Sequence, residues 1–171
     1  MLCAVEQRGL RRNFVADIVP SITPDEFTVS VRIRHPNIDP DEITSALGLE
    51  PQHSWQAGEA RRTAQGLPLE GSYRETYWTA EFRELDAGLR GVVATETVLL
   101  QAVVQLRRSQ PFLARLQSDG GNVELVVQVL SSSEFRFALS PELLSMISRI
   151  GVSLVLDVRA DAQMAVQRKA G

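Results

Sequence analysis

Phe27-Thr28-Val29-Ser30-Val31-Arg32-Ile33-Arg34 alternates strictly between apolar and polar side chains. Successive side chains of a strand point to opposite faces, so this stretch predicts a strand with one buried and one solvated face. Strands of that kind are typical of antiparallel sheets, whereas parallel strands covered on both faces read as continuous apolar runs. The stretch therefore predicts an antiparallel sheet that is covered on one side.

Similar patterns elsewhere in the chain predict the remaining strands. They lie at residues 76–82, 123–130, 135–139 and 152–158, with a shorter strand at 53–57. The segment from Gly58 to Ser72 contains three glycines and a proline, and we expect it to be a loop of about fifteen residues. Loops of that length in a compact domain are usually functional or mobile.

Two helices carry clear start and stop signals. Asp39-Pro40 is placed to cap and begin a short helix, which Gly48 ends. Ser140-Pro141 and Gly151 frame a second helix in the same way. Each helix then leads into a strand, so the two units suggest a weak internal duplication, although such caps are common enough to agree by chance.

A longer apolar-patterned segment, residues 95–118, predicts a central helix that Pro111 kinks or splits near Ser109. The order of elements predicts an α+β fold in which helices pack on one face of an antiparallel sheet. A ferredoxin-like sandwich is the first arrangement we expect.

The composition fits one soluble domain, because 171 residues with 44% hydrophobic side chains suffice to bury a core. We place this domain at residues 26–160, between an N-terminal extension (1–25) and a C-terminal tail (161–171). The net charge of −3 comes from acidic and basic residues mixed along the chain, which argues against a nucleic-acid partner. No apolar run reaches the roughly 18 residues that a membrane span requires.

The single cysteine, Cys3, has no partner for a disulfide, so we expect a cytoplasmic protein. Arg11-Arg12 resembles the start of a twin-arginine export signal, but Asp17 and Pro20 interrupt the apolar region that should follow. The sequence leaves the oligomeric state open.

Catalysis by a nucleophile with a histidine base needs a hydroxyl or thiol close to the imidazole. The chain has two histidines, His35 and His53, and no nucleophile motif accompanies either. Four side chains could be imagined as metal ligands: His35, Asp39, Asp41 and His53. Their spacing matches no common ligand pattern, and helix capping explains both aspartates. We therefore expect no metal and no cofactor, and we favour a non-catalytic protein while leaving an unrecognised activity open.

Both tryptophans and both tyrosines lie within residues 55–78, together with two adjacent arginines. Aromatic side chains beside arginines are typical of binding surfaces. The alternative interpretation is that Trp55 and Trp78 fill the core on neighbouring strands and that the arginines are simply solvated. The candidate binding residues are Trp55, Arg61, Arg62, Tyr73 and Tyr77.

Five short motifs follow one another in the first half of the domain. They are VRIRHP (31–36), IDPDEI (38–43), LGLEP (47–51), SW (54–55) and GE (58–59). In order and spacing, the segment from Phe27 to Phe82 resembles the bacterial family called domain of unknown function 4279. The chain departs from it at Glu59-Ala60, where many members carry Asp-Pro. The resemblance implies a small α+β domain and no established activity.

Two functions fit these observations. The first is a non-catalytic protein-interaction module, akin to the small acidic immunity proteins that neutralise bacterial toxins and so partnered by another protein. The second is a small-molecule-binding protein or unrecognised enzyme, with a pocket under the 58–72 loop. In that pocket Arg61 or Arg62 would hold an anionic group.

Overall fold

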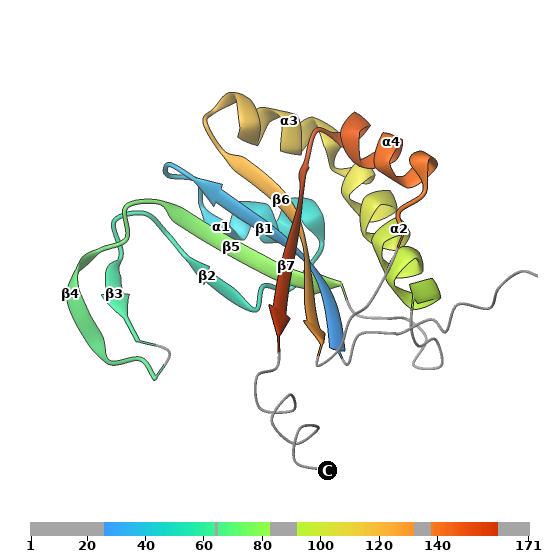
Figure 1. Cartoon of the computed structure of the whole chain (residues 1–171). Helices are drawn as coiled ribbons and strands as arrows, with labels where there is room; N and C mark the ends of the chain where they lie inside the picture. The colour runs from blue at the N-terminus through green and yellow to red at the C-terminus, as the bar shows by residue number, and fades with distance from the viewer. Residues whose placement is uncertain (1–25, 64, 83–91, 132–137, 161–171) are drawn as a thin grey trace, which may run out of the picture.

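The computed structural model describes residues 26–63, 65–82, 92–131 and 138–160 (Figure 1). Within these ranges the elements follow in the order β1 (Glu26–His35), α1 (Pro40–Leu47), β2 (His53–Trp55), β3 (Ala60–Arg62), β4 (Pro68–Ser72), β5 (Thr76–Phe82), α2 (Val92–Arg108), α3 (Gln110–Ser118), β6 (Asn122–Ser131), α4 (Pro141–Ile150) and β7 (Ser153–Ala160). Five strands form one sheet in the order β2-β5-β1-β6-β7, and β3 pairs with β4 in a separate hairpin. The predicted α+β fold is confirmed.

The sheet is antiparallel except at one edge. β1 lies in its centre and pairs antiparallel with β5 on one side and β6 on the other. β7 runs parallel to β6, so the prediction of a wholly antiparallel sheet is wrong for this pair. The chain reaches β7 through α4, and a helical crossover of this kind returns it to the same end of the sheet.

Some predictions concern residues outside the described ranges. These are the N-terminal extension (1–25), the C-terminal tail (161–171) and most of the strand expected at 135–139, of which only Ala138 and Leu139 are described and neither belongs to a strand. The ferredoxin-like arrangement and the internal duplication stay predictions. No helix in the described ranges is long and apolar enough to cross a membrane.

The core lies between the sheet and the helices. Val29, Val31 and Ile33 of β1 are almost completely buried, as the alternating pattern predicts. Val31 lies between Ala80 of β5 and Leu125 of β6, which are also buried. The apolar residues of α2 and α3 cover this face of the sheet; those fully or almost fully buried are Val98, Leu99, Ala102, Val103, Leu106, Leu113 and Leu116.

The other face of the sheet carries the polar residues of β1. Arg32 forms an ion pair with Glu124 of β6, with 2.6 Å between Nε and the nearer carboxylate oxygen. Thr28 donates a hydrogen bond to Gln128 of the same neighbouring strand. β1 therefore separates a dry face from a hydrogen-bonded polar face, and this separation fixes its register.

The helix ends follow the sequence signals. The Asp39 side chain accepts a hydrogen bond from the Asp41 backbone N–H at 2.9 Å, and Gly48 ends α1 with a φ of 62°. Ser140 caps α4 in the same way by accepting from the Leu143 backbone N–H. The predicted break near Ser109 is confirmed, since α2 ends at Arg108 and α3 begins at Gln110 with Pro111 in its first turn.

His35 shapes the turn that leads from β1 into α1. Its buried ring accepts two backbone hydrogen bonds at Nδ1, from Asn37 at 3.2 Å and from Ile38 at 2.9 Å. Nδ1 is therefore the unprotonated nitrogen and Nε2 carries the proton. Gly121 allows the ring to lie here, because a Cβ at that position would come within 2.8 Å of the His35 ring. These contacts explain His35 as a structural residue.

We predict that Val31→Asp lowers the free energy of unfolding by about 3 kcal/mol or more, because it places an unpaired charge in the core. Arg34→Asp is the matched control, since Arg34 lies on the same strand and is exposed; it should lose no more than about 1 kcal/mol. Urea denaturation of both variants measures the difference. Equal losses would contradict the assigned register.

We also predict that Asp39→Ala lowers the free energy of unfolding by about 0.5–2 kcal/mol, because the Asp41 backbone N–H in the first turn of α1 loses its acceptor. Asp41→Ala is the control, since Asp41 lies in the same first turn and contributes only its charge there. Thermal denaturation should show the larger loss for Asp39→Ala. The same loss in both variants would mean that charge near the helix terminus, and not capping, is responsible.

Candidate functional site

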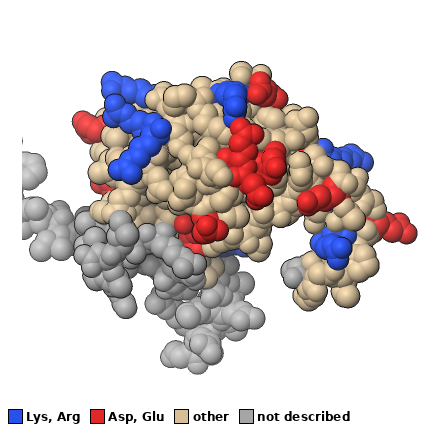
Figure 2. All heavy atoms as spheres, turned by 180° about the vertical axis from the view of Figure 1, so that it is seen from behind, with Lys and Arg blue, Asp and Glu red and all other residues tan. Residues whose placement is uncertain are grey.

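The segment predicted as a loop is a β-hairpin, so that prediction is wrong. β3 and β4 pair antiparallel, and the turn between them is closed by hydrogen bonds from the Gly66 N–H to the Thr63 carbonyl and from the Thr63 N–H to the Leu67 carbonyl, both at 2.8 Å. Every residue of both strands is exposed. The hairpin projects from the end of the sheet (Figure 1), and Figure 2 shows a hollow between it and the body of the molecule.

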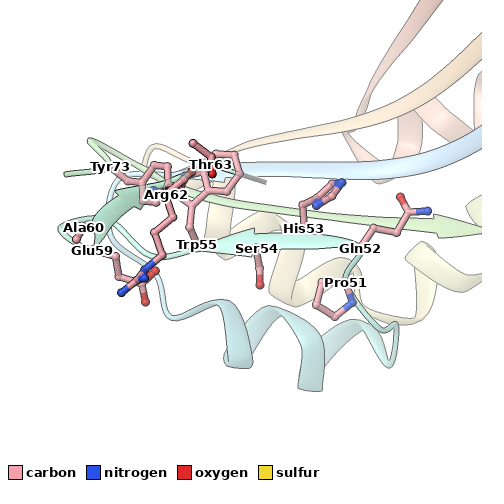
Figure 3. Close-up of a pocket in the computed structure, with 10 residues that line it drawn as sticks. All are labelled: Pro51, Gln52, His53, Ser54, Trp55, Glu59, Ala60, Arg62, Thr63 and Tyr73. Atoms are coloured by element: carbon pink, nitrogen blue, oxygen red, sulfur yellow. Dashed lines mark hydrogen bonds between the residues drawn. The ribbon is translucent and has the colours of Figure 1, made fainter. Parts of the chain in front are cut away.

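A cleft of about 840 Å³ runs along β2 and is bounded on one side by the hairpin (Figure 3). β2 is an edge strand of the five-stranded sheet, with β5 as its one neighbour among the described strands. The cleft is lined by Pro51, Gln52, His53, Ser54, Trp55, Glu59, Ala60, Arg62, Thr63 and Tyr73. It therefore combines an edge strand, an aromatic wall and charged groups of both signs.

Trp55 is the central ring of a three-ring stack. Its indole lies 4.7 Å from the Tyr73 ring and 4.3 Å from the Tyr77 ring, measured between centroids, with interplanar angles of 19° and 14°. Trp55 and Tyr77 are cross-strand partners on β2 and β5, whereas Tyr73 lies at the base of the hairpin. The stack therefore attaches the hairpin to the edge of the sheet.

The two tryptophans lie on opposite faces of the sheet. Trp78 is fully buried in the core, where its indole N–H donates to the Thr44 hydroxyl at 3.0 Å. Tyr77 directly precedes Trp78 on β5, so its side chain points to the opposite face of the sheet. Trp55 is the cross-strand partner of Tyr77 and therefore also lies on the face without helices. The interpretation of the tryptophans as core residues holds for Trp78 alone.

Backbone hydrogen bonds fix the base of the hairpin. The Gly58 N–H donates to the Tyr73 carbonyl at 2.8 Å, and the Tyr73 N–H donates to the Glu59 carbonyl at 2.9 Å. The Glu59 carboxylate also accepts from the Gln56 N–H at 3.1 Å. The Thr76 hydroxyl links this region to the turn between β1 and α1, because it accepts from the Ala57 N–H and donates to the Ile38 carbonyl. The hairpin is thus anchored at its base by both rings and backbone.

The two adjacent arginines have different surroundings. Arg62 lines the cleft, and one guanidinium nitrogen donates to the Gly66 carbonyl across the turn at 3.3 Å. Arg61 is exposed and is not among the residues that line the cleft. Neither forms a salt bridge with a described residue. The structure therefore separates the pair, leaving Arg62 as the cation at the cleft.

Three of the five candidate residues line the cleft directly: Trp55, Arg62 and Tyr73. Tyr77 is half-buried and supports Trp55 from its other face. The sequence interpretation considered His53 only as a metal ligand and missed its place in the cleft. Figure 3 shows it beside Trp55 on the same side of β2, with Ser54 on the opposite side. Alternation along β2 would have placed His53 with Trp55, had the short strand been recognised as the floor of a cleft.

A protein-family model, the domain of unknown function DUF4279, matches residues 25–161. The chain belongs to this family. The match extends well beyond the 27–82 segment that carries the sequence motifs and includes β6, α4 and β7, so the whole described fold is a DUF4279 domain. No curated protein and no solved structure matches the chain.

We predict that Trp55→Ala releases the hairpin from the sheet. Loss of two stacked aromatic contacts, each worth about 0.5–1.5 kcal/mol, should lower the free energy of unfolding by about 1–3 kcal/mol. Amide hydrogen exchange should become faster in β3 and β4. Ser54→Ala is the control on the same strand and should change neither quantity; similar behaviour of both variants would show that the stack does not hold the hairpin.

Proposed function

We propose that this DUF4279 domain is a non-catalytic binding module that holds an extended segment of a partner protein in the cleft along β2. The observation that carries the proposal is the course of the cleft, which follows the chain from Pro51 through the edge strand β2 to Trp55. Edge strands bind extended segments by adding them to the sheet, with backbone hydrogen bonds for affinity and side-chain pockets for specificity.

The walls of the cleft support a peptide ligand. On one side the half-buried Tyr73 and Trp55 line the cleft, with both faces of the Trp55 ring stacked against tyrosines. This wall is already ordered by stacking, so binding orders few side chains. On the hairpin side Arg62 offers planar donors that suit a carboxylate or a backbone carbonyl. A small immunity protein that neutralises a toxin would likewise need only a surface that matches its partner, and no active site.

A small anionic molecule is the second candidate ligand. A volume of about 840 Å³ lies within the range of roughly 300–1,000 Å³ that small-molecule sites occupy. Arg62 would then hold the anionic group while Trp55 or Tyr73 contacts its apolar part. The two candidates share Arg62 and differ in whether backbone pairing with β2 is required.

We predict that linear peptides selected from a displayed random library against the full chain bind in this cleft. Arg62→Ala should weaken their binding at least about tenfold, as removal of a central interface arginine does. Arg61→Ala is the matched control and should leave the affinity unchanged. Both variants should keep their free energy of unfolding within about 0.5 kcal/mol, since both positions are exposed.

Binding is measured by isothermal titration calorimetry with the selected peptides, and with inorganic phosphate and simple dicarboxylates as alternative ligands. Peptides that bind Arg61→Ala and wild type alike, and Arg62→Ala more weakly, support the protein-binding proposal. Selected peptides that bind Arg62→Ala with the same affinity as wild type would overturn it. Failure of all peptides, together with Arg62-dependent binding of a small anion, would replace it with the second candidate.

A further inference from the structure

The two edge strands of the sheet are β2 and β7, and β7 is the longer of the two. β7 comprises eight residues, Ser153–Ala160, and among the described strands β6 is its one neighbour. A long edge strand presents a row of unpaired backbone N–H and C=O groups, which can pair with a strand of another chain. β7 lies at the opposite edge from the β2 cleft and is independent of the function proposed there.

The C-terminal half of β7 exposes apolar side chains. Leu156 and Val158 retain 49% and 56% of their accessible surface. In the parallel register they lie level with Val127 and Val129 of β6, both of which are buried. Leu156 and Val158 therefore lie on the core side of the sheet, where their neighbours on β6 are covered and they are not. A second strand beside β7 would cover them.

The opposite face of β7 carries charges of both signs. Asp157 and Arg159 flank Val158 and form an ion pair at 3.1 Å. The hydrogen bond from Arg159 lowers the pKa of Asp157, so this carboxylate is charged at neutral pH. Alternation places both charges on the face away from the helices, one residue to each side of Val158.

We propose that two copies of this chain associate through β7, as antiparallel strands related by a two-fold axis at Val158. In this register Asp157 of each copy lies opposite Arg159 of the other, which gives two identical opposite-charge pairs. Val158 lies opposite its own counterpart on the core side. Residues 157–159 of the strand are therefore complementary to themselves, as a two-fold interface requires.

Charge matching selects this register over its neighbours. An axis at Asp157 would place two aspartates opposite each other, and an axis at Arg159 would do the same with two arginines; like charges in these positions are destabilising. An axis at Leu156 would place Asp157 opposite Val155 and leave the charges unmatched. Registers shifted by one residue would set the apolar face of one copy against the polar face of the other.

Sedimentation equilibrium of the full chain over a range of concentrations tests the proposal. We expect a reversible monomer–dimer equilibrium. Val158→Arg places two cations on the two-fold axis and should raise the dissociation constant about tenfold or more. Leu67→Arg is the matched control, because Leu67 is an equally exposed apolar residue on the hairpin; it should leave the equilibrium unchanged. Thermal denaturation of each variant verifies that the monomer is folded.

A charge exchange tests the register. Asp157→Arg alone should raise the dissociation constant about tenfold, because both cross-strand pairs become repulsive. The double variant Asp157→Arg with Arg159→Asp exchanges the charges and should restore the wild-type value. Such restoration supports the axis at Val158. Three results would each overturn the proposal. They are a protein that stays monomeric at all concentrations, a dimer whose dissociation constant Val158→Arg does not change, and a double variant whose dissociation constant does not return to the wild-type value.

Discussion

Burial of one face of β1 is the constraint on which the rest of the structure depends. β5 and β6 pair with β1 on either side, and the helices cover the face that carries Val29, Val31 and Ile33. These three side chains are therefore almost completely buried. A slip of one residue would bring Arg32 and Arg34 into the core and expose all three apolar side chains. The register of β1 therefore fixes which face of β5 meets the helices, and so places Trp78 in the core and Tyr77 on the open face.

The position of Tyr77 then determines the site. Because Tyr77 lies on the open face of β5, its cross-strand partner Trp55 lies there too, and Tyr73 completes the stack at the base of the hairpin. The rings are thus mainly a means of holding the hairpin beside β2. This makes Trp55 a poor probe of ligand contact, since its removal should also move the hairpin. Arg62 is the better probe, because its side chain has one hydrogen bond within the turn and no other described role.

Strong local signals were enough to predict the core, the caps of α1 and α4, and the break near Ser109 that Pro111 causes. The hairpin was missed because the strands ARR and PLEGS are exposed throughout and carry no apolar alternation, the signal from which a strand is recognised. The parallel direction of β7 was missed because alternation reports only that one face of a strand is covered. Such strands are typical of antiparallel sheets, but a parallel pair at the edge of a sheet can show the same pattern. The different surroundings of Arg61 and Arg62 depend on the hairpin and follow from the structure alone.

Both edge strands of the sheet leave backbone N–H and C=O groups without a neighbouring strand in the described part of the chain, and the two edges differ in what lies beside them. At β2 the strand is only three residues long, and a hairpin held by stacked rings lies beside it, which leaves a cleft of limited length. At β7 the strand is long, apolar on one face and matched in charge to itself. Since these edges lie at opposite ends of the strand order, a dimer through β7 would continue the sheet and leave both β2 clefts at its outer ends. If each cleft binds an extended segment as proposed, self-association would produce a bivalent binder, whose avidity for a repeated or dimeric partner exceeds that of a single cleft.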